Sequence, residues 1–142
     1  MVRVALGFVD DLPGVLLVSG SGEEVMAIDF EVVHYGDPSF DIAFLLNHLL
    51  LKMLHRPGWR EGYAACAAEF WRTVEAAVEA EWLEASTIRH LGCLLLARID
   101  GKSPAEYIKD PARRDAIRAR ARDLILNPPA SINEVFECES LD

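Results

Sequence analysis

The sequence changes its hydrophobic period at the turn formed by residues 36–38, Gly-Asp-Pro. Before this turn, apolar residues alternate with others at 2–8, and two short apolar runs at 15–18 and 25–28 flank a glycine-serine turn. Such patterns predict strands, the last two paired as a hairpin. After the turn, apolar residues recur every three to four positions over long stretches, which predicts helices. A chain with this order of periods is restricted to a few strands followed by a helical part.

Clear boundary signals divide the helical part. Proline inside a first turn, glycine after a last turn and Ser-x-x-Glu capping boxes mark where helices begin and end. The predicted helices span 38–54, 59–80 and 81–99, then one opened by the capping box at Ser103, one from Asp110 to about 126, and a short one opened by the capping box at Ser131.

These elements predict an α+β fold class, with a small antiparallel β-sheet or hairpin at the N-terminus followed by a bundle of five to six helices. The length of 142 residues fits a single domain, 1–142. Within it we expect strands in 1–36 and a helical subdomain in 37–142. No internal repeat or low-complexity linker divides the sequence.

The composition is that of a globular protein with an acidic surface. Hydrophobic residues make up 51% of the chain, and the formal net charge is −9, from 14 basic and 23 acidic residues. This charge disfavours nucleic acid, and it fits either a cationic small-molecule ligand or a general role in solubility. The apolar runs are too short and interrupted for a membrane span, and the start lacks the features of a signal peptide. We therefore expect a cytoplasmic protein without a membrane partner.

Several chemically active side chains are expected to be structural. Arg98 stands two residues from Asp100, so the two are predicted to form a local ion pair. Others lie in apolar helical stretches, which predicts small core cysteines and core or boundary histidines. These residues are Cys66, Cys93, His48 and His90.

Two carboxylates near the change of period are candidate site residues. Asp29 follows the apolar run at 25–28, and Asp41 stands in the first turn of the helix predicted from residue 38. A carboxylate that leaves a buried strand into a loop is a common way to hold Mg²⁺ beside a phosphate. Asp41 has an alternative structural role, because an acidic residue is favoured in the first turn of any helix.

The segment 28–43, Ile-Asp-Phe-Glu-Val-Val-His-Tyr-Gly-Asp-Pro-Ser-Phe-Asp-Ile-Ala, resembles the metal-binding region of the aminoglycoside phosphotransferase family, which includes the choline kinases. The resemblance implies the C-terminal lobe of a kinase-like fold, with Mg²⁺ and ATP as cofactors. It implies that Asp10 is the catalytic base, with Asp11 as a one-residue alternative. It also implies that Asp29 binds the metal and that Asp41 braces the catalytic loop. The implied reaction moves a phosphoryl group from ATP to a small-molecule hydroxyl.

The catalytic loop departs from the family pattern His-Gly-Asp-x-x-Pro-x-Asn. Phe8, Val9 and Val15 stand at the His, Gly and metal-binding Asn positions, and a valine side chain has no lone pair for a metal. The sequence also begins almost at this loop, without the N-terminal lobe that the family uses for the nucleotide. These departures predict a truncated protein that is inactive alone.

The alternative function is a non-catalytic pseudo-kinase module that associates with itself or binds a partner or a small ligand. Loss of a covering lobe would leave apolar surface exposed, and large exposed apolar patches drive association. We therefore expect a homo-oligomer, most simply a two-fold dimer.

Overall fold

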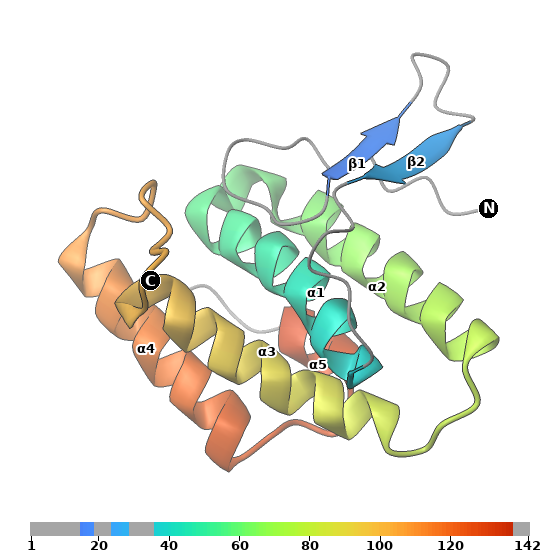
Figure 1. The fold of residues 1–142 in the computed structure, drawn as a ribbon. Coiled ribbons are helices and arrows are strands. Elements are labelled where there is room, and N and C mark those ends of the chain that lie inside the picture. The colour runs from blue at the N-terminus through green and yellow to red at the C-terminus, as the bar shows by residue number, and fades with distance from the viewer. Residues whose placement is uncertain (1–14, 19–23, 29–35, 138–142) are drawn as a thin grey trace. The chain divides into compact units, whose positions relative to one another are not determined.

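The computed structural model describes residues 15–18, 24–28 and 36–137, and the chain divides into two compact units between Gly36 and Asp37 (Figure 1). The first unit contains the strands β1 (Val15–Val18) and β2 (Val25–Ile28), which pair antiparallel. The second unit contains the helices α1 (Pro38–His55), α2 (Arg60–Ala77), α3 (Leu83–Asp100), α4 (Pro111–Leu126) and α5 (Ile132–Glu137), and the 3-10 helix η2 (Pro57–Trp59).

The predicted α+β fold class is wrong, because the described part of the chain folds mainly as a helical bundle of five α-helices. Within the described residues of the second unit, every regular element is helical. The described strands have four residues each and belong to the first unit. Two strands of this length are too few to form a sheet layer with a core of its own. The strand predicted at 2–8 lies outside the described residues.

α1 is the central helix of the bundle. It packs against α2 on one side and α3 on the other, while α3 also packs against α4, and α5 packs mainly against α2 (Figure 1). Every residue from Leu46 to Leu51 is buried, as expected for a helix enclosed by neighbours. Because burying a leucine side chain stabilises by about 1.5–3 kcal/mol, this half of α1 anchors the bundle. Among the described helices, none has the length and apolar character needed to cross a bilayer.

The predicted starts of three helices are confirmed, and each start has a side-chain cap. The side chains of Asp37 and Asp110 accept backbone N–H groups at the starts of α1 and α4, each followed by a proline at the first helical position. Before α5, the backbone N–H of Glu134 donates to Ser131 Oγ at 3.3 Å, as the second capping box predicts.

The helix predicted at Ser103 is not formed, because tertiary contacts hold this segment as turns. The backbone N–H of Ala105 donates to the carbonyl oxygen of Arg98 at 2.7 Å, which ties the segment back to the end of α3. Ala105 and Ile108 are both buried. Burial of two apolar side chains outweighs the weak preference of so short a segment for helix.

The predicted ion pair between Arg98 and Asp100 is also wrong. Asp100 accepts instead from Arg118 on α4, whose Nε lies 2.8 Å from Asp100 Oδ2 and 2.9 Å from Oδ1. These hydrogen bonds lower the pKa of the Asp100 carboxyl and join α3 to α4. Residues two apart on a helix do not face each other, so a partner from a neighbouring helix has the better geometry.

The predicted core positions of the two helical cysteines are wrong. Cys66 on α2 and Cys93 on α3 are exposed free thiols. Each helix is buried along one stripe, so a residue in an apolar stretch can still face solvent when its angular position lies outside that stripe.

A substitution at Gly92 tests the close approach of α3 and α4. A Cβ atom there would lie 2.9 Å from Ile125 Cγ1 and 3.0 Å from the backbone oxygen of Ala121. We expect Gly92→Ala to lower the free energy of unfolding by about 1–2 kcal/mol, because overpacking outweighs the gain in helix propensity. Gly62→Ala on α2 is the control, since a Cβ there has no atom within 4 Å.

Urea unfolding at equilibrium measures both variants. Gly62→Ala should gain up to about 1 kcal/mol from helix propensity. A Gly92→Ala protein as stable as the wild type would contradict the close contact of α3 with α4.

Candidate functional site

The structure describes one of the three predicted site residues. Asp41 lies exposed in the first turn of α1, and its carboxylate makes no side-chain hydrogen bond or ion pair within the described residues. Asp10 and Asp29, the predicted catalytic and metal-binding residues, lie outside the described residues, as does the loop that Asp41 was expected to brace. Their roles stay predictions. In the part of the chain that the structure describes, no three His, Cys, Asp or Glu side chains gather to hold a metal.

The start of α1 is fixed by a chain of hydrogen bonds that reaches α3. Asp37 Oδ1 accepts from the backbone N–H of Ser39 at 2.9 Å and from Ser39 Oγ at 2.7 Å. The bond from the Ser39 hydroxyl lowers the pKa of the Asp37 carboxyl. Ser39 Oγ also lies 2.9 Å from His90 Nδ1 on α3. The cap of α1 is therefore linked to the neighbouring helix.

The order of these three groups is unsuited to nucleophilic catalysis. In a catalytic triad the histidine stands between serine and carboxylate and accepts the serine proton. Here the serine stands in the middle and donates its proton to Asp37, so His90 Nδ1–H must donate to Ser39 Oγ. Ser39 is also fully buried, out of reach of a substrate. The arrangement is a helix cap with a cross-helix hydrogen bond.

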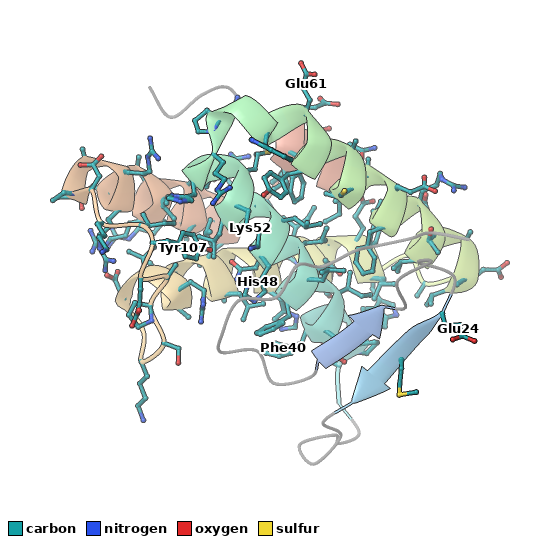
Figure 2. All side chains as sticks on the ribbon, turned by 90° about the horizontal axis from the view of Figure 1, so that it is seen from above. Glu24, Phe40, His48, Lys52, Glu61 and Tyr107 are labelled. Carbon is teal, nitrogen blue, oxygen red and sulfur yellow. The ribbon has the colours of Figure 1, made fainter. Side chains whose placement is uncertain are left out.

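Four side chains at four-residue spacing form a row along one side of α1. We call Phe40, Phe44, His48 and Lys52 the α1 row. The ring centroids of Phe40 and Phe44 lie 6.2 Å apart, and the ring of Phe44 meets His48 edge-on at 5.1 Å. Figure 2 shows Phe40, His48 and Lys52 along one side of α1, with Tyr107 beside its second half. The row changes from an exposed aromatic ring at Phe40 to a buried imidazole at His48 and a half-buried ammonium at Lys52.

The buried end of the row has a strongly positive environment. Burial first, and the nearby charges of Arg98 and Lys52 next, lower the pKa of His48 from 6.5 to about 4. His48 is only 9% exposed, and its Nε2 has no hydrogen-bond partner among the described residues. Nε of Arg98, on α3, is likewise buried and without a partner there. The helical unit therefore encloses a neutral imidazole between two cations, and we call His48, Lys52 and Arg98 the cation cluster.

The C-terminal end of α1 extends this positive region. The rings of His55 and Tyr107 lie 4.9 Å apart, and Arg113 Nη1 donates to the carbonyl oxygen of His55 at 3.4 Å. Burial, followed by the charges of Arg56 and Arg113, lowers the pKa of His55. Burial of part of its ring raises the pKa of the Tyr107 hydroxyl.

The sequence analysis did not predict the α1 row or the cation cluster, although the sequence contains a signal for part of them. The prediction of core or boundary positions for the two helical histidines is confirmed, because His48 is buried and His90 is half-buried. The four-residue spacing of the α1 row was a signal that its members share one side of a helix. By contrast, Arg98 is 50 positions from His48, so only the packing of α3 on α1 could reveal their proximity.

Comparisons of this chain with protein-family models, with curated proteins and with solved structures found no match.

The pH dependence of stability tests the buried neutral state of His48. Because the unfolded chain binds this proton near pH 6.5 and the folded chain only near pH 4, stability falls as pH decreases through this window. At pH 4.5 we expect His48 to account for a loss of about 2–3 kcal/mol relative to pH 7.5. His48→Leu should remove that part of the loss. Urea unfolding of both proteins at the two pH values measures it, and an equal pH dependence would show that His48 is not held neutral.

Proposed function

We propose that this chain derives from a small-molecule kinase of the aminoglycoside phosphotransferase type and keeps a weakened site for Mg²⁺ and ATP. In this proposal Asp29 is the metal ligand, Asp10 is the remnant of the catalytic base, and Asp41 braces the catalytic loop. The acceptor is a small molecule with a hydroxyl group. By itself the chain does not transfer phosphate efficiently, since transfer depends on positioning and charge compensation that the altered loop does not supply.

The start of α1 carries this proposal. Asp37 caps the helix, Pro38 occupies its first turn, and Asp41 stands exposed on that turn, free to accept hydrogen bonds. The resemblance implies a turn after the metal-binding residue and then a bracing carboxylate in the first turn of the next helix. A helix N-terminus also favours a neighbouring anionic group, which suits a bracing carboxylate there.

The pairing of β1 with β2 gives a second, independent argument. Val15 stands at the family's metal-binding Asn position, and its Cα partner across the hairpin is Ile28. Asp29 follows Ile28 directly in the chain. The pairing of Val15 with the residue that precedes Asp29 in the chain supports the proposal, in which one metal-ligand position is altered to valine and one is kept as aspartate.

Calorimetry with Mg²⁺ and ATP tests the proposal. We expect weak, Mg²⁺-dependent binding by the wild type that disappears in Asp29→Ala. Val15→Asn restores an oxygen ligand and should tighten binding about tenfold, the effect of roughly 1.4 kcal/mol from one charge-assisted contact. Val18→Asn, at the other end of β1, controls for adding a polar side chain to the strand. Absence of Mg²⁺-dependent binding in both the wild type and Val15→Asn would reject the phosphotransferase site.

The second candidate function is a non-catalytic module that forms a homodimer. The observation in its favour is the connection between α2 and α3, where Val78 and Trp82 are large apolar residues and Trp82 is 52% exposed. Tryptophan side chains dominate the binding energy of many protein interfaces.

The exposed thiols of Cys66 and Cys93 form no disulfide with each other in the structure. Free thiols fit a protein that works in a reducing compartment such as the cytoplasm.

Light scattering after size exclusion tests the dimer. We expect about twice the chain mass of 15.8 kDa for the wild type and a monomer for Trp82→Ser, because the variant loses the apolar anchor. Trp59→Ser removes an equally large exposed side chain from another part of the surface and should leave the dimer intact. A monomeric wild type, or loss of the dimer in both variants, would contradict an interface at Trp82.

A further inference from the structure

The cation cluster holds buried polar atoms that lack a partner among the described residues. His48 is nine-tenths buried with a free Nε2, and Nε of Arg98 is buried and free as well. Buried polar atoms are nearly always hydrogen-bonded, so two such atoms in neighbouring side chains indicate a place that a bound group completes.

The charges of the cluster also lack compensation. The ion pairs of the described residues involve Arg72, Arg118 and Arg120, and neither Lys52 nor Arg98 takes part in one. The charges that act on His48 come from Lys52 on its own helix and from Arg98 on α3, and both are positive. Arg98 also acts on Tyr107, which precedes α4. A positive region without a neighbouring negative charge, in a protein of net charge −9, favours the binding of an anion.

We propose that the cation cluster binds a phosphate group. The two negative charges of a phosphate dianion compensate the two positive charges of Lys52 and Arg98. Its oxygens can accept from the planar guanidinium of Arg98, from the ammonium of Lys52 and from Nε2–H of His48. The free atoms of the cluster are all potential donors, which matches an acceptor-only ligand.

The neighbours of the cluster favour a phosphate joined to an apolar group. The ring of Phe44 lies 5.1 Å from that of His48, and Tyr107 lies beside the second half of α1 (Figure 2). Further along the α1 row, the ring of Phe40 is 45% exposed and open to a ligand. The shared chemistry is the phosphate group, whether free in solution or part of an aromatic phosphomonoester.

Proton NMR of the histidine rings tests the site on the whole chain in phosphate-free buffer, with inorganic phosphate as the probe. We expect a saturable shift of the His48 Cε1–H signal, assigned by its loss in His48→Leu. We also expect the pKa of His48 to rise by at least one unit with phosphate bound, since a neighbouring anion favours the imidazolium. A His48 signal that does not respond to phosphate overturns the proposal.

Charge-removing variants distinguish the site from general attraction. Arg98→Met and Lys52→Met should each weaken phosphate binding at least tenfold. Arg89→Met removes an exposed arginine from the same helix as Arg98 and should leave binding unchanged. Equal weakening in Arg89→Met, or none in the two cluster variants, overturns the site. Using two variants keeps the test decisive if one of them fails to fold.

Two further arms separate this proposal from its alternatives. Asp29→Ala, which should abolish Mg²⁺–ATP binding, should leave phosphate binding unchanged, because the proposed donors are His48, Lys52 and Arg98. Phosphate binding that vanishes in Asp29→Ala overturns a separate site. In the second arm, phenyl phosphate that binds more tightly than inorganic phosphate supports the site and assigns its ligand to the organic phosphates. Equal binding of the two supports the site with free phosphate as its ligand.

Discussion

Enclosure of the second half of α1 is the constraint on which the helical unit depends. Residues 46–51 are buried on every side of the helix, so the polar side chains in this stretch cannot face solvent. Asn47 is fully buried, and neither polar atom of its amide has a partner among the described residues. His48 is also buried, and its Nε2 has no partner among the described residues. Its lowered pKa keeps the ring neutral. A core helix that carries such residues loses stability through them, which indicates that they serve something besides packing.

The cap at the other end of α1 complements this enclosure. Asp37 fixes where the helix begins, and the hydrogen bond between Ser39 and His90 fixes the position of α1 along α3. That contact and the influence of Arg98 on His48 lie in the same order along both helices, so α1 and α3 run in the same direction. The start of α1 therefore determines which residue of α3 lies beside His48, in the middle of the same helix.

The sequence could predict local structure but not the neighbours of each element. The boundaries of α1 and α4 follow from Asp37-Pro38 and Asp110-Pro111, because caps act within a few residues. The segment at Ser103 has an equally good cap, yet burial of Ala105 and Ile108 decides its structure. The partner of Asp100 stands 18 positions away on α4, beyond any local rule. The α+β prediction was based on two short strands. Their alternation is visible in the sequence, but the sequence does not show how little of the fold they form. For the site, the first-turn position of Asp41 was predictable, whereas the cation cluster depended on the packing of α3 against α1.

The two proposed phosphate sites differ in how they would neutralise charge. Carboxylates such as Asp29 repel a phosphate unless a divalent cation stands between them, so that site works only with Mg²⁺. The cation cluster supplies its own positive charge from Lys52 and Arg98, and a metal there would add repulsion. Burial of the His48 ring and of Arg98 Nε strengthens the contacts that these two groups make with a bound phosphate. An acidic chain that nevertheless keeps two cations together around a neutral histidine therefore has a stronger physical reason to bind phosphate in its helical unit than its net charge would indicate.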